Sequence, residues 1–380
     1  MALRMTALKH RSIRVSRMNN KLLLVGSIPG KDASDAMTTC ADGIGDFLDC
    51  YPDGETGSRR IWINYLAATC YDGNPALETI SRPLPVDPKH PDEWRSPTES
   101  WAPRGYADHW QFRVKPGVEA VRFENLGYAN VAKESYADFC QLRDDGVIGK
   151  DARFMAALPL IESAIRPFLT NSADFEIMWQ AYAEALQREV MDLTDCIPAN
   201  DIVVQWDICI EVVAIDADEG NKQIFPWQPN GDAYERYLTA LALAAERVPP
   251  RALMGLHLCY GDLGHRHIIE PDDLGTVTKM ANSAAELIKR DIDYYHMPVP
   301  RDRNDDAYFE PLSDLNIGSG KLYLGLVHTT GGVDTSLGLL ETASKHVQGF
   351  GIATECGFGR RPTESISELL EIHRTVAQKL

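Results

Sequence analysis

The chain has 380 residues, 44% of them apolar, which is enough to bury the core of one large domain or of two ordinary ones. Its formal net charge of −17 repels nucleic-acid backbones and anionic lipid surfaces, so neither is expected as a partner. No segment approaches the roughly 20 consecutive apolar residues of a membrane span, and the cysteines lack the dense spacing of a disulfide-stapled secreted domain. A soluble cytoplasmic protein with reduced thiols is therefore expected.

The first twenty residues are basic. They contain four arginines, one lysine and no acid, a composition typical of organelle transit peptides. A flexible tail, or translation that truly begins at Met18, explains the same composition more simply. We therefore expect residues 1–20 to lie outside the folded domain, with a mitochondrial location as the alternative to a cytoplasmic one.

From Lys21 onward, short apolar runs alternate with longer amphipathic segments, a pattern typical of parallel strands joined by crossover helices. Strands are predicted at residues 22–29, 46–55, 153–159, 202–207, 252–259, 292–297, 322–328 and 350–356. Between them, segments such as 175–193 and 274–288 repeat their apolar residues at a helical period. Eight such units predict an α/β fold, a (β/α)8 TIM barrel over residues 21–380.

The expected barrel leaves residues to spare, because a fold of this kind needs about 250. Residues 72–150 contain no clear strand–helix repeat and are rich in proline and aromatic residues. A segment of that length between the second and third strands is predicted to be a lid-like insertion over the barrel mouth. A smaller insertion is predicted at residues 222–232.

Polar groups stand at the ends of the predicted strands, although the strand bodies are almost wholly apolar. In TIM barrels the active site is built from the carboxyl ends of the strands and from the loops that follow them. The candidate site residues at these ends are Gly26, Ser27, Glu55, Asp207, His257, Cys259, His296, His328 and Cys356.

The segment Gly255-Leu256-His257-Leu258-Cys259 suggests a metal site. Residues two apart on a strand point the same way, so His257 and Cys259 can reach one ion. Zinc prefers imidazole and thiolate ligands, and a catalytic zinc site usually takes three from the protein. His-x-Cys alone is a weak signal, since such residues in an apolar run more often belong to packed core, but His296 and Cys356 at other strand ends could complete the ligand set.

Several motifs follow one another in the order found in a known family. They are Gly26-Ser27-Ile28-Pro29, Gly54-Glu55, Val204-Gln205-Trp206-Asp207, His257-Leu258-Cys259-Tyr260 and Glu355-Cys356-Gly357-Phe358-Gly359-Arg360-Arg361. The pattern resembles the catalytic domain of cobalamin-independent methionine synthase and its relatives, a zinc-dependent branch of the uroporphyrinogen-decarboxylase-like barrels. The resemblance covers residues 22–70 and 150–380. The Glu-Pro that follows the family's aspartate is absent here, and so is the family's amino-terminal half, which argues against folate binding.

The resemblance implies a zinc-dependent methyl- or alkyltransferase that activates a small thiol as a zinc-bound thiolate for attack on an alkyl donor. It implies His257, Cys259 and Cys356 as zinc ligands, and His328 as the general acid. Glu55 and Asp207 would bind the amino group of the thiol substrate, and Gly26 and Ser27 its carboxylate. The family has a zinc-ligating glutamate at the position of His296, which leaves two sets open: four ligands including His296, or three without it.

Two competing functions remain at this stage. One is a metal-free decarboxylase or lyase of the uroporphyrinogen-decarboxylase type, and retention of both cysteines argues against it. The other is a non-catalytic small-molecule-binding protein. The altered position at His296 and the missing Glu-Pro after Asp207 are the features that favour it.

Overall fold

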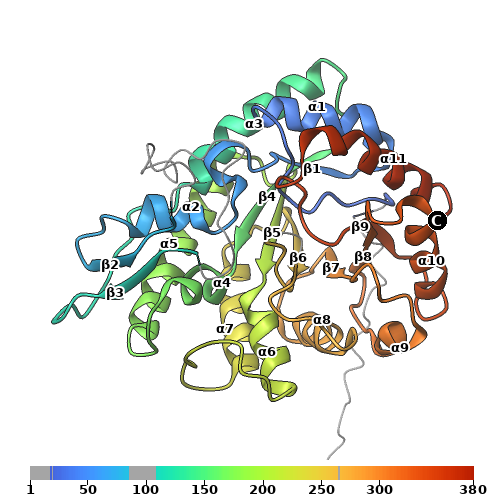
Figure 1. Cartoon of the computed structure of the whole chain (residues 1–380). Coiled ribbons are helices and arrows are strands. Elements are labelled where there is room, and N and C mark those ends of the chain that lie inside the picture. The colour runs from blue at the N-terminus through green and yellow to red at the C-terminus, as the bar shows by residue number, and fades with distance from the viewer. Residues whose placement is uncertain (1–17, 19, 85–107, 264–265) are drawn as a thin grey trace, which may run out of the picture.

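The computed structural model describes residue 18 and residues 20–84, 108–263 and 266–380. Its centre is a curled parallel sheet with the strand order β1-β4-β5-β6-β7-β8-β9 (Figure 1). These strands are β1 Cys50–Pro52, β4 Arg153–Pro159, β5 Ile202–Ile208, β6 Leu253–Leu258, β7 Tyr294–Pro298, β8 Lys321–Val327 and β9 Gly351–Thr354. Seven of the eight predicted strands are thereby confirmed, and the class is α/β.

The first predicted strand, residues 22–29, is not a regular strand. Leu22 instead makes single parallel bridges to Leu48 and to Ile352, and Ser27 bridges Gly54. These partners lie on or beside β9 and β1, so the segment runs between the two edges of the sheet. Pro29 has no backbone N–H, which helps to end the pairing there. The regular sheet thus has seven strands, where the sequence predicted a barrel of eight.

Helices surround the sheet on its outer side (Figure 1). The longer ones are α1 Ala33–Ile44, α3 Tyr128–Asp144, α5 Phe175–Cys196, α6 Ile210–Glu219, α7 Ala233–Glu246, α8 Gly275–Leu287, α10 Gly332–Ala343 and α11 Ile366–Ala377. Short helices are α2 Asn64–Leu66, α4 Ile161–Ile165 and α9 Asp306–Phe309. The helices predicted at 175–193 and 274–288 are confirmed as α5 and α8. Within the described ranges, none of the helices has the length and hydropathy needed to cross a bilayer.

The inner face of the sheet carries an apolar cluster below the strand ends. Its members are Met18, Leu23, Val25, Cys50, Met155, Val203, Leu253, Tyr294, Tyr323 and Ala353, all buried. Along β6 the side chains alternate, so Leu253 in this cluster shares its face with Gly255 and His257. The same alternation leads from Val203 on β5 to Asp207. Packing at the bottom of the sheet therefore fixes the direction of the polar side chains at its carboxyl ends.

Gly255 makes room for the layer directly under the site. A Cβ at this position would overlap the ring of Tyr294, which packs across the inner face. The Tyr294 hydroxyl donates to Gln205 Oε1 at 2.7 Å, and Gln205 Nε2 donates to Asp207 Oδ1 at 2.9 Å. A glycine in the strand thus allows a buried tyrosine to hold the amide that orients Asp207.

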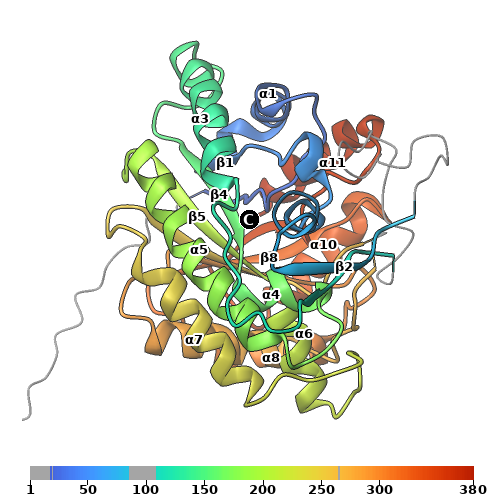
Figure 2. The same ribbon diagram turned by 90° about the vertical axis from the view of Figure 1, so that its left-hand side faces the viewer.

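Part of the predicted insertion 72–150 has regular structure. It contains the antiparallel hairpin of β2 Leu77–Ser81 and β3 Gln111–Val114, followed by α3. The hairpin lies outside the ring of helices, and Figure 2 shows it from its own side. Residues 85–107 fall outside the described residues, as does the predicted amino-terminal tail apart from Met18 and Asn20.

Candidate metal centre and adjoining cavity

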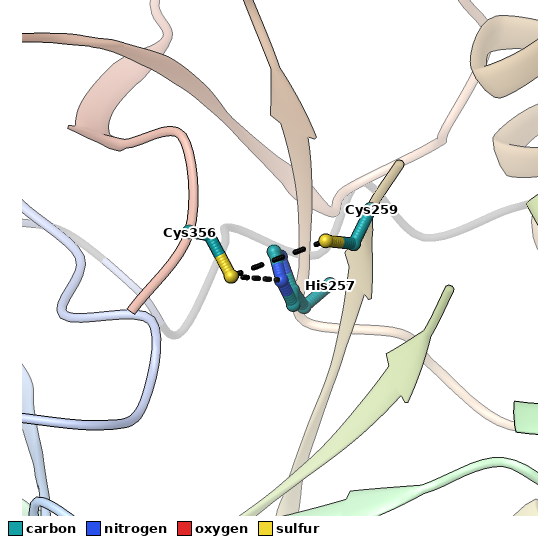
Figure 3. A group of neighbouring side chains, drawn as sticks. All are labelled: His257, Cys259 and Cys356. Carbon is teal, nitrogen blue, oxygen red and sulfur yellow. Dashed lines mark hydrogen bonds between the residues drawn. The ribbon is translucent and has the colours of Figure 1, made fainter. Parts of the chain in front are cut away.

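Three side chains from two strand ends converge at the carboxyl edge of the sheet (Figure 3). His257 lies on β6, Cys259 directly follows it, and Cys356 follows β9 by two residues. The Sγ atoms of Cys259 and Cys356 are 3.9 Å apart, and Cys356 Sγ is 3.8 Å from His257 Nε2. Neighbouring ligands of one tetrahedral zinc ion are roughly 3.5–3.8 Å apart, given bonds of about 2.0–2.3 Å. The three residues therefore form a candidate metal site.

Cys356 is held there because Gly357 allows its loop to pack against Ser27. A Cβ on Gly357 would lie 2.5 Å from Ser27 Oγ and 2.8 Å from its backbone nitrogen. The next residues are bonded to the same serine: Phe358 N donates to Ser27 O at 2.8 Å and Gly359 N to Ser27 Oγ at 3.3 Å. Ser27 keeps its own hydroxyl proton for a further acceptor.

His296 contacts the Nδ1 side of the His257 ring, whereas Cys356 lies on its Nε2 side. Its Nδ1 is 2.7 Å from His257 Nδ1, and its Nε2 is 3.0 Å from the carbonyl oxygen of Thr354. A carbonyl only accepts, so the proton of His296 lies on Nε2 and its Nδ1 accepts from His257. His257 Nε2 then carries the free lone pair on the side of Cys356. The geometry brings together the three-residue ligand set that the sequence left open, without His296.

Burial keeps this histidine pair uncharged. It lowers the pKa of His296 to about 3, and burial together with His296 lowers that of His257. Interaction with the Cys209 thiol, and then burial, raises the pKa of the Cys259 thiol. The pKa of the Cys356 thiol is raised by its interaction with Cys259 and by burial. The donors are thus a neutral imidazole and two thiols whose ionisation needs a nearby positive charge, which a bound cation would supply.

Two buried carboxyl groups lie on the wall of the adjoining cavity. Burial raises the pKa of Glu55 to about 7, with Arg59 lowering it and Asp53 raising it further. Burial, together with Glu55, raises the pKa of Asp207 well above its usual range, against the hydrogen bond from Gln205. Both carboxyl groups are therefore easier to protonate than free ones, and the Glu55 carboxylate, which can attract a cationic ligand, forms near neutral pH.

The structure does not bring His328 into this cavity. Its Nε2 is 2.9 Å from the carbonyl oxygen of Val299, and its Nδ1 is 4.0 Å from Glu355 Oε2. Burial lowers its pKa, and it is not among the described residues that line the cavity. The role of general acid stays a prediction for His328.

The cavity has a volume of about 450 Å³ and joins the predicted residues to others that sequence reasoning missed. Gly26, Ser27, Glu55, Asp207, His257, Cys259 and Cys356 all line it. Among the missed residues are Trp62, His109, Arg166, Phe225, Trp227 and Arg360. Arg360 is part of the motif quoted above, and Phe225 and Trp227 lie in the predicted insertion 222–232. Trp62 and Arg166 had no signal in the sequence.

The donor set fits zinc. Two sulfur ligands and one neutral imidazole nitrogen are the ligand types zinc prefers, and three protein ligands are usual where a substrate takes the fourth place. The hydrogen bond between His296 and His257 also fixes the tautomer that a metal-bound histidine needs. The residues present are therefore suited to hold this ion.

The fold and the site together define an α/β protein with a curled parallel sheet and a His–Cys–Cys cluster at its carboxyl edge. The chain matches no protein-family model and no curated protein sequence. Two solved structures share its fold. A B12-independent methionine synthase from Shewanella sp. W3-18-1, in complex with selenomethionine, has a TM-score of 0.59 and 13% identity, covering 95% of this chain and 97% of that one. A protein of Listeria monocytogenes assigned to the vitamin-B12-independent methionine synthases has a TM-score of 0.55 and 13% identity, covering 96% and 98%.

Proposed function

We propose that this protein is a zinc-dependent methyl- or alkyltransferase that activates a small thiol for attack on an electrophilic carbon. The observation that carries the proposal is the convergence of the ligand atoms of His257, Cys259 and Cys356 within 4.8 Å of one another beside the cavity. The names of the two structural neighbours support it, since both refer to methionine synthases. We further propose that residues 21–27 take the place of the first strand of a (β/α)8 barrel.

His257 Nε2 and the sulfur atoms of Cys259 and Cys356 would hold the zinc ion. Zinc bound there would lower the pKa of a substrate thiol, so that a thiolate is available at neutral pH. In the reaction, sulfur forms a bond to the alkyl carbon while the bond from that carbon to the donor breaks. The donor atom leaves with the electron pair and takes up a proton.

The remaining predicted residues would position the thiol. Glu55 would bind a substrate ammonium group, and Asp207 would add a hydrogen bond. The free hydroxyl proton of Ser27 would be donated to a substrate carboxylate. Arg360 Nη2 lies 2.9 Å from Asp262 and 4.0 Å from Cys356 Sγ, so its positive charge favours the thiolate form of that ligand.

Binding of an amino thiol is expected to depend on pH through Glu55. Its pKa of about 7 means that the carboxylate, which attracts the ammonium group, forms as the pH rises from 6 to 8. The KM for cysteine or homocysteine should therefore fall over this range, by up to about tenfold per pH unit below the pKa. For Glu55→Gln the KM should be high and its profile flat. A thiol without an amine, 3-mercaptopropionate, is the matched control, and the same pH profile for both thiols would contradict this role.

Zinc analysis and X-ray absorption test the function itself. Protein purified without chelator should contain close to one zinc ion per chain, bound by two sulfur atoms and one imidazole nitrogen. Addition of the substrate thiol should add a third sulfur at about 2.3 Å. Absence of zinc would favour a metal-free lyase or a binding protein. Zinc with no change on adding cysteine, homocysteine or 2-mercaptoethanesulfonate would contradict thiol activation.

A further inference from the structure

One side of the cavity is apolar. We call it the apolar wall and define it by Trp62, Ile63, Phe168, Ile224, Phe225 and Trp227. These residues come from three separate segments of the chain. All except Phe168 are only half buried, so large apolar side chains remain partly exposed inside a concave site. Occupation by an apolar molecule would remove this surface from water, which is favourable.

The cationic side chains of the cavity are already paired. Among the described lining residues there are two arginines and no lysine. Arg166 Nη1 is 2.6 Å from Glu162 Oε1, and its guanidinium lies 3.7 Å from the centre of the Phe225 ring. Arg360 is paired with Asp262. Because both lining arginines are already held in ion pairs and Glu55 faces the same space, the cavity disfavours an anionic ligand.

The segment that carries Trp62 is also strained. Ile63 has a φ of 67°, a region that a β-branched residue rarely adopts. Glu55, at the other end of the same segment, has a φ of 49°. Both residues line the cavity. Backbone strain of this kind costs about 1–3 kcal/mol and collects where a chain is shaped for a ligand. This observation is independent of the polarity of the wall.

From these features we propose that the apolar wall binds an uncharged, ring-containing molecule, and that this molecule is the alkyl donor. The second clause rests on the proposed function, whereas the first does not. The cavity volume of about 450 Å³ is within the range of sites for drug-sized ligands. The charge pattern of the cavity disfavours donors that carry several anionic groups.

Two fluorescent probes test the binding preference. N-phenyl-1-naphthylamine and 8-anilinonaphthalene-1-sulfonate share one ring skeleton and differ by a single sulfonate. The full chain should bind one molecule of the uncharged probe, at least about tenfold more tightly than the sulfonate, because both lining arginines are already in ion pairs and Glu55 repels the sulfonate. Protein treated with a chelator to remove any bound metal should bind it equally well. Because neither metal nor turnover enters this measurement, failure of the zinc proposal and failure of this one give different results.

A charge placed on the wall should reverse the preference. Ile224→Lys is expected to weaken binding of the uncharged probe about tenfold or more and to strengthen that of the sulfonate. Ile80→Lys is the matched control, because Ile80 lies on β2, is 45% exposed and does not line the cavity. If Ile224→Lys fails to fold, Ile224→Ala should still weaken binding of the uncharged probe several-fold, because it removes apolar surface from the wall. Equal affinity for the two probes, or equal responses of Ile224→Lys and Ile80→Lys, would overturn the proposal.

Discussion

Replacement of Cys259 by serine is expected to release the metal and to abolish thiol alkylation together. A structural zinc site binds with about 10–16 kcal/mol, so the loss of one of three or four ligands should weaken binding by about a hundredfold or more. The remaining two donors, His257 and Cys356, do not satisfy the preference of zinc for four ligands. Elemental analysis of the purified variant, with a chelator titration and an alkylation assay, measures both effects.

The control for this experiment is Cys196→Ser. Cys196 is an exposed thiol at the end of α5, outside the candidate site, so its loss should change neither zinc content nor turnover. The contrary result would be a Cys259→Ser protein that retains stoichiometric zinc and full activity. That outcome would remove the metal role from the cluster.

Replacement of His296 by alanine is expected to weaken metal binding by about 10–100-fold, the usual effect of losing the hydrogen-bond partner of a metal-bound histidine. The alanine variant leaves the Nδ1 proton of His257 and the carbonyl of Thr354 without their present partner. His257 can then rotate or change tautomer, which withdraws Nε2 from Cys356. A competitive chelator titration measures the change in affinity.

His296→Gln distinguishes a positioning role from loss of packing. A glutamine can accept from His257 with its oxygen and donate to Thr354 with its nitrogen, so it should restore part of the affinity. X-ray absorption should show two sulfur atoms and one imidazole in the parent and in both variants. Loss of one nitrogen scatterer in His296→Ala would instead show that His296 is itself a ligand.

The sequence predicted the site through the strand ends. Short apolar runs identified β4 to β9, and the period of two along β6 placed His257 and Cys259 on one face. Because parallel strands end at a common edge, Cys356 after β9 could be expected close to them. The 3.9 Å between its sulfur and that of Cys259 agrees with this expectation.

The sequence could not separate the candidate metal ligand His257 from His296, which contacts it. His257 and His296 are paired across β6 and β7, and both point inward, so strand position alone predicts the same role for each. Their different roles become visible only in the contact between the two rings.

The irregular segment 22–27 could not be predicted either. An apolar run does not reveal that its backbone hydrogen bonds are divided between the regions of β1 and β9.

The walls of the cavity were the least predictable part. Trp62 and Phe225 lie in connections without helical or strand periodicity, and their partners are far away in sequence. Arg166 illustrates the difficulty, because its ion pair with Glu162 is local whereas its stacking on Phe225 is not. Tertiary packing alone brings these side chains to one place.

The apolar cluster that fills the amino-terminal end of the sheet has a kinetic consequence. Because the described residues Met18, Tyr294 and Tyr323 pack together there, we expect substrates and products to enter and leave at the opposite rim. Glu55 and Asp207, the residues proposed to bind the amino thiol, are buried, whereas the apolar wall keeps partly exposed surface. On the proposed reaction, the thiol must enter first and the thioether must depart last. Turnover would then follow a compulsory order, with an excess of the second substrate blocking access for the first.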